Sequence, residues 1–283
     1  MVANGEQARD GDGRPGSVTG APSLPPATLR EHLPGLEPER QVSDWGRSEL
    51  VEGALDRFLY DFLFHYWFRV EVEGITNVPP DGPGLLIANR AGALPTDAAM
   101  IAKAIREHRP SAHPVHFATD RRLGTVPGLD MLLVKAGAIN AHPANLHRLM
   151  FDEGQLVLAF AQEGPAAVLR ERYRLAPFVR LAPLKVALRA GVPIVPVAVM
   201  GSEEAAPVLG RLGFGRLGFG RLRRLPVAAA LPLPAKVRIR FLEPVVSEPD
   251  GQDNAETLAA DLRSLIQENL LEMLSQRRSV WLG

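Results

Sequence analysis

Asn89, Arg90 and Asp97 lie close together in the chain, where an apolar run gives way to a helical pattern. Residues 85–88 have the composition of a buried strand, and Asp97 precedes the apolar pattern AAMIAKAI. In α/β proteins a loop between a strand and a helix lies at the carboxyl end of the sheet, where ligands bind and exposed backbone N–H groups favour anions. We therefore expect the functional site in this loop.

The segment resembles the first motif of the glycerolipid acyltransferases, the family of lysophosphatidate and glycerol-3-phosphate acyltransferases. A similar branch of that family reads Asn-His-Ser-Gly-x-Leu-Pro-x-Asp, and the matching residues here are Asn89, Gly92, Leu94, Pro95 and Asp97. Arg90 stands where the family has its catalytic histidine. The resemblance implies that Arg90 and Asp97 occupy the catalytic positions and that Asn89 and Gly92 bind substrate.

The side chain at position 90 decides what chemistry this loop can perform. In the family, a histidine removes the proton of an acceptor hydroxyl as it attacks an acyl thioester, and the Asp orients the imidazole. Arg90 cannot act as that base, because a guanidinium has a pKa above about 12 and no acceptor lone pair. It can hold a phosphate or a carboxylate bidentately. Asp97 has a second explanation, as a helix N-cap, and the two roles are compatible.

A later segment corresponds to the family's Phe-Pro-Glu-Gly motif, which ends a strand and precedes residues that help to hold the acceptor's phosphate. The residues here are Ala161, Gln162, Glu163 and Gly164, so only the Glu and the Gly remain. The resemblance implies substrate binding by Glu163, Gly164 and the basic side chains Arg170, Arg172 and Arg174. The alternative, which the sequence favours, is that these arginines do not bind phosphate and form a solvated charged turn.

The resemblance covers roughly residues 70–246 and includes a strand, GVPIVPVAVM, that is similar to the family's last motif. In this region apolar runs alternate with helical patterns, which predicts one α/β domain with a mixed sheet flanked by helices. The predicted strands are residues 85–89, 115–119, 156–160, 194–199 and 237–241. Helices are expected over 48–70, 183–191 and 254–278, and from Asp97 onward.

Two segments precede the α/β domain, which we place at residues 70–283. Residues 1–42 are rich in Gly, Pro, Ser and charge, and this composition predicts a disordered tail. Residues 43–69 form an amphipathic helical region with an aromatic-rich carboxyl half. Such a helix could dock on a membrane or pack across the sheet, and the pattern does not separate these alternatives.

The length and composition of the chain exclude several classes of protein and of functional site. A chain of 283 residues with 46% apolar side chains can bury a substantial core, and 32 basic against 32 acidic residues do not suggest a nucleic-acid partner. The absence of cysteine excludes disulfides, thiolate metal sites and a cysteine nucleophile. No apolar run approaches the roughly 18 residues of a membrane span, and no signal peptide is recognisable. We expect a cytoplasmic protein that binds the membrane surface peripherally.

Residues outside these two motifs could also contribute to function. Four histidines could be proposed as a replacement base: His113, His116, His142 and His147. A lone histidine is more often a surface or hydrogen-bonded residue than a catalyst, and we favour that interpretation for each of them. Residues 210–224 repeat Arg with Leu and Phe, which suits either an anionic lipid surface or a partly buried loop. No His/Asp/Glu cluster has metal-binding spacing and no nucleotide fingerprint follows a strand, so we expect no metal and no cofactor.

Two functions fit these observations. The first is a divergent, slow acyltransferase that moves a fatty acyl group from acyl-CoA or acyl carrier protein to the hydroxyl of a (lyso)glycerolipid. The second is a non-catalytic relative that binds lipid or acyl donor. The family resemblance favours the first, whereas Arg90 together with Ala161 and Gln162 favours the second.

Overall fold

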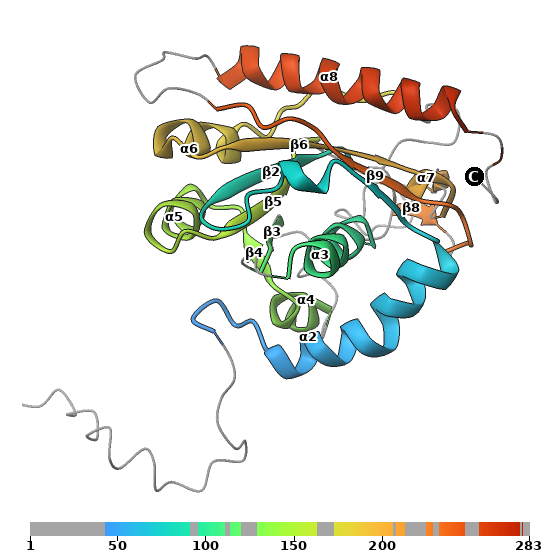
Figure 1. The fold of residues 1–283 in the computed structure, drawn as a ribbon, viewed down its shortest axis with the longest axis horizontal. Helices are drawn as coiled ribbons and strands as arrows, with labels where there is room; N and C mark the ends of the chain where they lie inside the picture. The colour runs from blue at the N-terminus through green and yellow to red at the C-terminus, as the bar shows by residue number, and fades with distance from the viewer. Residues whose placement is uncertain are drawn as a thin grey trace, which may run out of the picture. The chain divides into compact units, whose positions relative to one another are not determined.

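The computed structural model describes residues 43–90, 96–110, 114–119, 129–162, 173–205, 208–212, 225–228, 232–246, 255–277 and 279. The predicted tail, residues 1–42, lies outside this described part. A seven-stranded mixed sheet with helices on both faces forms the body of the described chain (Figure 1). The α/β class predicted from the sequence is confirmed.

The sheet has the strand order β1-β9-β6-β2-β5-β3-β4. Its members are β1 (Glu71–Glu73), β2 (Gly84–Ala88), β3 (His116–Thr119), β4 (Ala138–Asn140), β5 (Leu156–Phe160), β6 (Ile194–Met200) and β9 (Arg238–Phe241). Strands β6, β2, β5, β3 and β4 are mutually parallel, while β9 runs antiparallel to β6. Each predicted strand is present within one residue of its expected bounds. The central parallel strands β2, β5 and β6 are covered on both faces, and for this reason they are continuous apolar runs without polar alternation.

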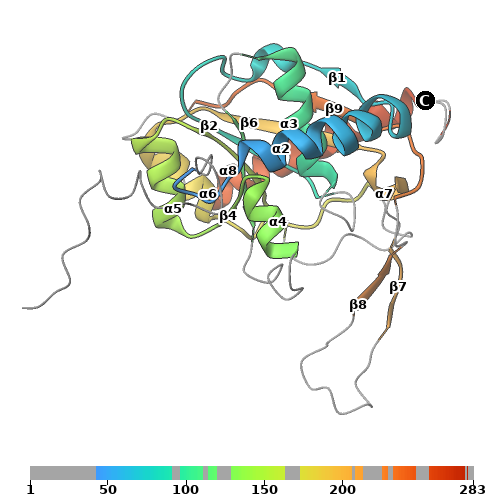
Figure 2. The same ribbon diagram turned by 90° about the horizontal axis from the view of Figure 1, so that it is seen from below.

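A separate antiparallel hairpin, β7 (Val208–Leu212) and β8 (Leu225–Ala228), projects from the rest of the described chain (Figure 2). The Arg/Leu/Phe segment predicted at 210–224 begins within β7, and its residues 213–224 lie outside the described part. None of the helices among the described residues is both long enough and apolar enough to cross a membrane.

Helices cover the two faces of the sheet (Figure 1). One face carries α5 (Pro143–His147), the π-helical turn η5 (Arg148–Asp152), α6 (Ala182–Ala190) and α8 (Ala255–Ser275). The other carries α3 (Thr96–His108), and the remaining short elements are η3 (Ile75–Asn77), α4 (Leu129–Lys135) and α7 (Ser202–Ala205). Strand β2 contributes to both cores, because side chains alternate along a strand: Leu85 and Ile87 lie in one cluster, Leu86 and Ala88 in the other.

Residues 49–67 form a continuous helical stretch, called here the N-terminal helical run. It begins as α2 (Glu49–Leu55), whose N-cap Ser48 accepts a hydrogen bond from the Val51 N–H, and continues through the π-helical turns η1 (Asp56–Tyr60) and η2 (Leu63–Trp67). Phe64 is buried in the core beneath it. Phe58 and Tyr66 are 79% and 71% exposed. The run therefore packs against the domain and also presents apolar side chains outward.

A ladder of ion pairs fixes the N-terminal helical run on α3. Arg47 holds Glu52 bidentately, with Nε–Oε2 and Nη2–Oε1 distances of 2.6 and 2.5 Å. Arg106 of α3 contacts Glu52 as well, and its Nη1 lies 2.9 Å from Asp56 Oδ1. Lys103 continues the ladder, with Nζ 3.3 Å from Asp56 Oδ2. Leaving a largely buried charge without its partner costs free energy. Because a shift of the run along α3 would break these pairs, they fix the position of the run.

His116, at the start of β3, is buried and uncharged at neutral pH. Burial, assisted by the Arg47 guanidinium, lowers the pKa of His116 from 6.5 to about 4. The unfolded chain therefore takes up a proton at this position at higher pH than the folded chain does. Acidification consequently favours the unfolded state.

We expect the contribution of His116 to be constant above about pH 6.5, and to lower the free energy of unfolding progressively toward pH 4 by about 3 kcal/mol. His116→Gln removes this titration, so its stability should decline less steeply with acidification. Urea unfolding between about pH 7 and 4.5 measures the difference. His147→Gln, at a half-exposed histidine, is the matched control. Equal slopes in the wild type and His116→Gln would contradict the assignment.

Candidate functional site

The carboxyl ends of β5, β2 and β6 meet at one edge of the sheet, because these strands are parallel and paired in register. Ala88 at the end of β2 pairs with Phe160 of β5 and with Val197 of β6. The loop after β2 leads from this edge into α3. The predicted residues Asn89, Arg90 and Asp97 therefore belong to the carboxyl edge, as expected for a ligand site.

Asn89 continues the sheet ladder with its side chain. Its Nδ2 donates to the Val199 carbonyl at 2.9 Å, and the Val199 N–H donates back to Oδ1 at 2.7 Å. The residue is only 1% exposed. Both polar groups of the carboxamide thus satisfy the backbone of β6, and we assign Asn89 a positioning role. Its contact with a substrate stays a prediction.

Arg90 joins the two motif segments that the sequence analysis singled out. Its backbone N–H donates to Gln162 Oε1 at 2.9 Å, and Gln162, two residues after the end of β5, bridges to Phe178. Arg90 itself is half-buried. The backbone of residue 90 is therefore held by the segment that follows β5.

Asp97 lies in the first turn of α3 and is 2% exposed. A carboxylate at this end of a helix is stabilised by the partial positive charge of the helix N-terminus. Asp97 is thus placed at the same edge as Arg90, at the far end of one loop.

Of the remaining predicted substrate-binding residues, the structure describes only Arg174. Gly92 lies outside the described residues, as do Glu163, Gly164, Arg170 and Arg172. Arg174 is described and is exposed. Its role stays a prediction.

An apolar pocket of about 190 Å³ runs along α3 from its first turn. It is lined by side chains of the N-terminal helical run, α3, β3 and α4: Glu52, Leu55, Leu59, Tyr60, Leu63, Thr96, Ala98, Ala99, Ala102, Lys103, Arg106, Phe117, Leu132, Leu133 and Ala136. Thr96, in this lining, is the neighbour of Asp97. Leu59 and Leu132 are 44% and 41% exposed, so the apolar lining continues to the surface.

A second hollow, of about 260 Å³, lies at the carboxyl edge between the ends of the strands and the start of α6. Its lining includes Ala118, Ala159 and Phe160 of the strands, and Arg180 just before α6. It offers space for a polar group next to the segment that carries Gln162.

A buried polar network involves α7, which follows β6, and it was not predicted from the sequence. Tyr173 donates its backbone N–H to Glu203 Oε2 at 2.8 Å and its hydroxyl to Glu204. Arg277 Nη1 donates to the Tyr173 oxygen at 2.8 Å and to Glu204 Oε1 at 3.0 Å. Burial, and then the negative charge of Glu204, raises the pKa of Tyr173, so its hydroxyl remains a donor. The network anchors Tyr173, where the described chain resumes after residue 162.

The structure rules out His116 as a replacement base. It stands at the amino end of β3, at the edge of the sheet opposite Arg90, and its low pKa reflects burial. His142 accepts the Ala144 N–H as the N-cap of α5, after β4. Strand β4 is three strands from β2, about 14 Å at normal strand spacing. His147 lies further along α5, and His113 lies outside the described residues.

Comparison with known proteins agrees with this architecture. Residues 69–200 match the protein family described as Acyltransferase. An uncharacterized protein of Mycobacterium tuberculosis is 33% identical over 272 residues, which cover 90% of this chain and 75% of that protein. An uncharacterized protein of Mycobacterium leprae is 33% identical over 271 residues, covering 90% and 73%. The crystal structure of the 1-acyl-sn-glycerophosphate (LPA) acyltransferase PlsC from Thermotoga maritima is similar in fold, with a TM-score of 0.55 and 20% identity over 81% of this chain and 80% of that one.

The two hydrogen bonds between Asn89 and Val199 give a stability prediction. Asn89→Ala leaves a buried N–H and a buried C=O without partners, which should lower the free energy of unfolding by about 2–4 kcal/mol. Asn89→Asp should not restore stability, because a carboxylate cannot donate to the Val199 carbonyl. Urea unfolding measures both variants. Asn145→Ala, which removes a surface hydrogen bond to the Asn140 carbonyl, is the control. An Asn89→Asp variant as stable as the wild type would refute this role.

Proposed function

This chain belongs to the acyltransferase family, and we propose that it transfers a fatty acyl group from acyl-CoA or acyl carrier protein to the hydroxyl of a (lyso)glycerolipid. We further propose that Arg90 occupies the position of the family's histidine and that transfer is therefore slow. The apolar pocket beside the first turn of α3 carries this proposal.

The pocket suits the hydrocarbon part of an acyl donor. Each methylene that leaves water for such a lining contributes about 0.8 kcal/mol. The pocket includes Thr96, so a chain that fills it would bring its thioester toward Asp97 and the end of β2. The length of the pocket along α3 would then separate the apolar tail from the reacting group.

The polar end of a substrate would meet Arg90 and the start of α3. A guanidinium binds phosphate or carboxylate bidentately, and the N-terminus of a helix attracts anions. Arg90 is half-buried, so such a contact would be less screened by solvent than one at the surface. We assign Arg90 to anion binding, with Asp97 at the other end of the loop.

A second function, binding without turnover, is favoured by the same residue. A hydroxyl acceptor needs a base as it attacks, and Arg90 cannot supply one. Gln162 stands in the eroded second motif and is engaged with the Arg90 backbone. A chain that retains the scaffold but lacks the base would still bind donor and lipid.

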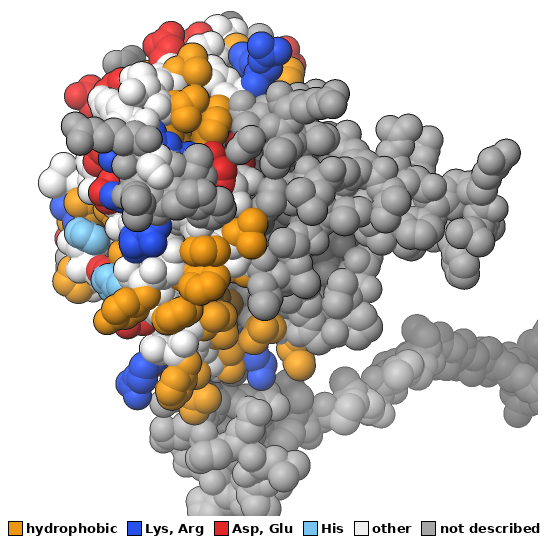
Figure 3. Space-filling model, turned by 90° about the vertical axis from the view of Figure 1, so that its right-hand side faces the viewer, with side chains coloured by type: hydrophobic (Ala, Val, Ile, Leu, Met, Phe, Trp, Pro, Cys, Tyr) orange, Lys and Arg blue, Asp and Glu red, His pale blue; other side chains and the backbone are white. Residues whose placement is uncertain are grey.

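We also propose that the protein docks on the cytoplasmic face of a membrane through the N-terminal helical run. Phe58, Phe62 and Tyr66 are exposed along this run. Figure 3 shows hydrophobic side chains gathered low on the face that it draws, which is the side of the molecule where Figure 1 places the carboxyl end of this run. Leu59 and Leu132 connect this surface with the pocket, so an acyl chain could pass between bilayer and pocket without crossing water.

Replacing Phe58 and Phe62 by serine should weaken membrane binding. Together the two rings provide enough apolar area that we expect at least about a tenfold loss of partitioning. Flotation with vesicles that contain anionic phospholipid measures the bound fraction. Leu271→Ser, on the exposed side of α8, is the matched control and should float like the wild type.

The repeat at 210–224 is tested separately, by changing Arg211, Arg216, Arg221, Arg223 and Arg224 to Glu. Basic side chains near an anionic surface contribute about 1 kcal/mol each, so this variant should also lose binding. Equal recovery of the wild type and the Glu variant would exclude the repeat from docking. Equal recovery after the Phe substitutions would exclude the helical run.

Arg90→His should raise turnover, because it places an imidazole in a loop that also carries Asp97. The general-base contribution is roughly 100- to 10,000-fold. Release of free thiol from acyl-CoA and acylation of a lysophospholipid are measured in parallel for the wild type, Arg90→His, Arg90→Ala and Asp97→Ala. Strong wild-type turnover that is insensitive to Asp97→Ala would reject this site as the catalytic centre.

The pocket is tested by filling it with Ala99→Trp. Binding of a long-chain acyl donor should fall, while binding of a short-chain donor such as acetyl-CoA should not change. Ala260→Trp, at an exposed position of α8, controls for the added ring. If neither the wild type nor Arg90→His shows turnover but Ala99→Trp still lowers long-chain binding by the wild-type chain, the non-catalytic function is the correct one. Equal long-chain binding by the wild type and Ala99→Trp would reject the pocket.

A further inference from the structure

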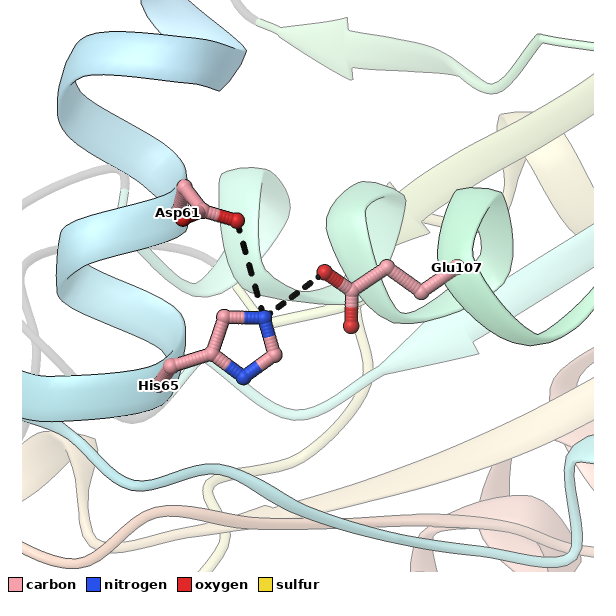
Figure 4. A group of neighbouring side chains, drawn as sticks. All are labelled: Asp61, His65 and Glu107. Atoms are coloured by element: carbon pink, nitrogen blue, oxygen red, sulfur yellow. Dashed lines mark hydrogen bonds and ion pairs between the residues drawn. The ribbon is translucent and has the colours of Figure 1, made fainter.

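Three side chains with metal-binding atoms converge between the N-terminal helical run and α3 (Figure 4). His65 Nε2 lies 2.9 Å from Glu107 Oε1 and 3.6 Å from Asp61 Oδ1. One ligand atom from each residue lies within 4.8 Å of the others. Asp61 and His65 are one helical turn apart on the run, and Glu107 belongs to the last turn of α3. Three potential ligands from two helices therefore share one small volume.

We propose that Asp61, His65 and Glu107 form a binding site for a divalent transition-metal ion, with Zn²⁺ as the ion that its ligand set fits best. Zn²⁺ accepts imidazole nitrogen and carboxylate oxygen at about 2.0–2.2 Å in a tetrahedral arrangement, which places the donor atoms about 3.3 Å apart. The observed separations of 2.9 and 3.6 Å lie on either side of this value. Three protein ligands leave the fourth position to solvent.

Lys103 bears on this site because its ammonium contacts the same two carboxylates. Its Nζ lies 3.2 Å from Asp61 Oδ1 and 3.1 Å from Glu107 Oε1, and its side chain is 7% exposed. Burial opposes its charge, but hydrogen bonds to Glu107 and Asp61 raise its pKa, so Lys103 stays protonated. The ammonium thus occupies the inner side of the two carboxylates.

The outer side of the cluster faces solvent, where the side chains of His65 and Asp61 are 45% and 47% exposed. An ion arriving there would meet the imidazole and the outward lone pairs of the carboxylates. Outer hydrogen-bond partners commonly fix the orientation of carboxylate ligands, and Lys103 would have this role. Its repulsion of the ion is offset by the carboxylates around it, which include Asp56 as well as the two ligands.

The site would join the N-terminal helical run to α3 at the end of the ion-pair ladder. This run covers the apolar pocket and carries exposed aromatic side chains, so a bound ion would hold the cover of the pocket in place. The inference does not depend on acyl transfer. No metal site was expected from the sequence, in which Glu107 is 42 residues from His65. The spacing of Asp61 and His65 by four residues was the visible part of the signal.

Titration of the chelator-treated full chain with ZnCl₂ in a calorimeter tests the proposal. We expect saturable binding of one ion per chain, a higher melting temperature in Zn²⁺, and visible absorption typical of tetrahedral Co²⁺ when CoCl₂ replaces ZnCl₂. His65→Ala should weaken Zn²⁺ binding by more than the roughly 10- to 100-fold loss that follows removal of a residue that only hydrogen-bonds to a ligand. Acidification should weaken binding as well, because the imidazole must be unprotonated to ligate.

His147→Ala is the matched control, because His147 is also half-exposed and lies 4.0 Å from a single carboxylate, Asp152. It should bind Zn²⁺ like the wild type. His65 is exposed, so its replacement should leave the fold intact, and unchanged circular dichroism verifies this. Absence of saturable binding in the wild type would overturn the proposal, as would equal affinities of the wild type and His65→Ala.

Discussion

The two hydrogen bonds between the Asn89 side chain and the Val199 backbone hold the candidate site together. Strand β2 pairs with both neighbours only as far as Ala88, and the Asn89 carboxamide then reaches further along β6 in place of the backbone. On the opposite side, the Arg90 N–H is held by Gln162 at the end of β5. The loop is thus pinned to both neighbouring strands at its first two residues. Because neither contact uses the side chain of residue 90, the same backbone would present a histidine or an arginine at the same place.

The N-terminal helical run shows how one helix can serve the core and a surface together. Phe64 and Phe68 are buried with the sheet, whereas Phe58 and Tyr66 remain exposed. The sequence left membrane docking and packing across the sheet as alternatives, and the described structure shows the packing while leaving an apolar surface free. Ion pairs connect the run to α3, and the apolar pocket between the two elements has charged residues at its margin. The N-terminal helical run is thus held to α3 by charged side chains, and it presents apolar side chains both to the pocket and to the surface.

The elements that the sequence predicted well are those determined by local pattern. Buried parallel strands such as 156–160 appear as apolar runs, and α6 has Pro in its first turn and Gly191 at its end with φ of 62°. Contacts between distant residues were not predictable in this way. The partners of Glu204 lie 31 and 73 residues away, and only the fold brings them together. The place of His116 was predictable, since the direction of a parallel strand assigns its first residue to the edge away from the site.

The fixed points around the second motif bear on the choice between turnover and binding. Gln162 is held at the end of β5 by its bridge to Phe178 and by its hydrogen bond to Arg90. Tyr173 is held by Glu203, Glu204 and Arg277, at a φ of 61° that few non-glycine residues adopt. The described chain is therefore anchored on both sides of the segment that carries the predicted acceptor-binding residues. Gln162 and Tyr173 thus mark the two described positions between which any acceptor-binding side chains of this segment would have to act. If Arg90 occupies the position of the family's histidine, as we propose, the missing base lowers the rate of the chemical step more than the affinity for the substrate.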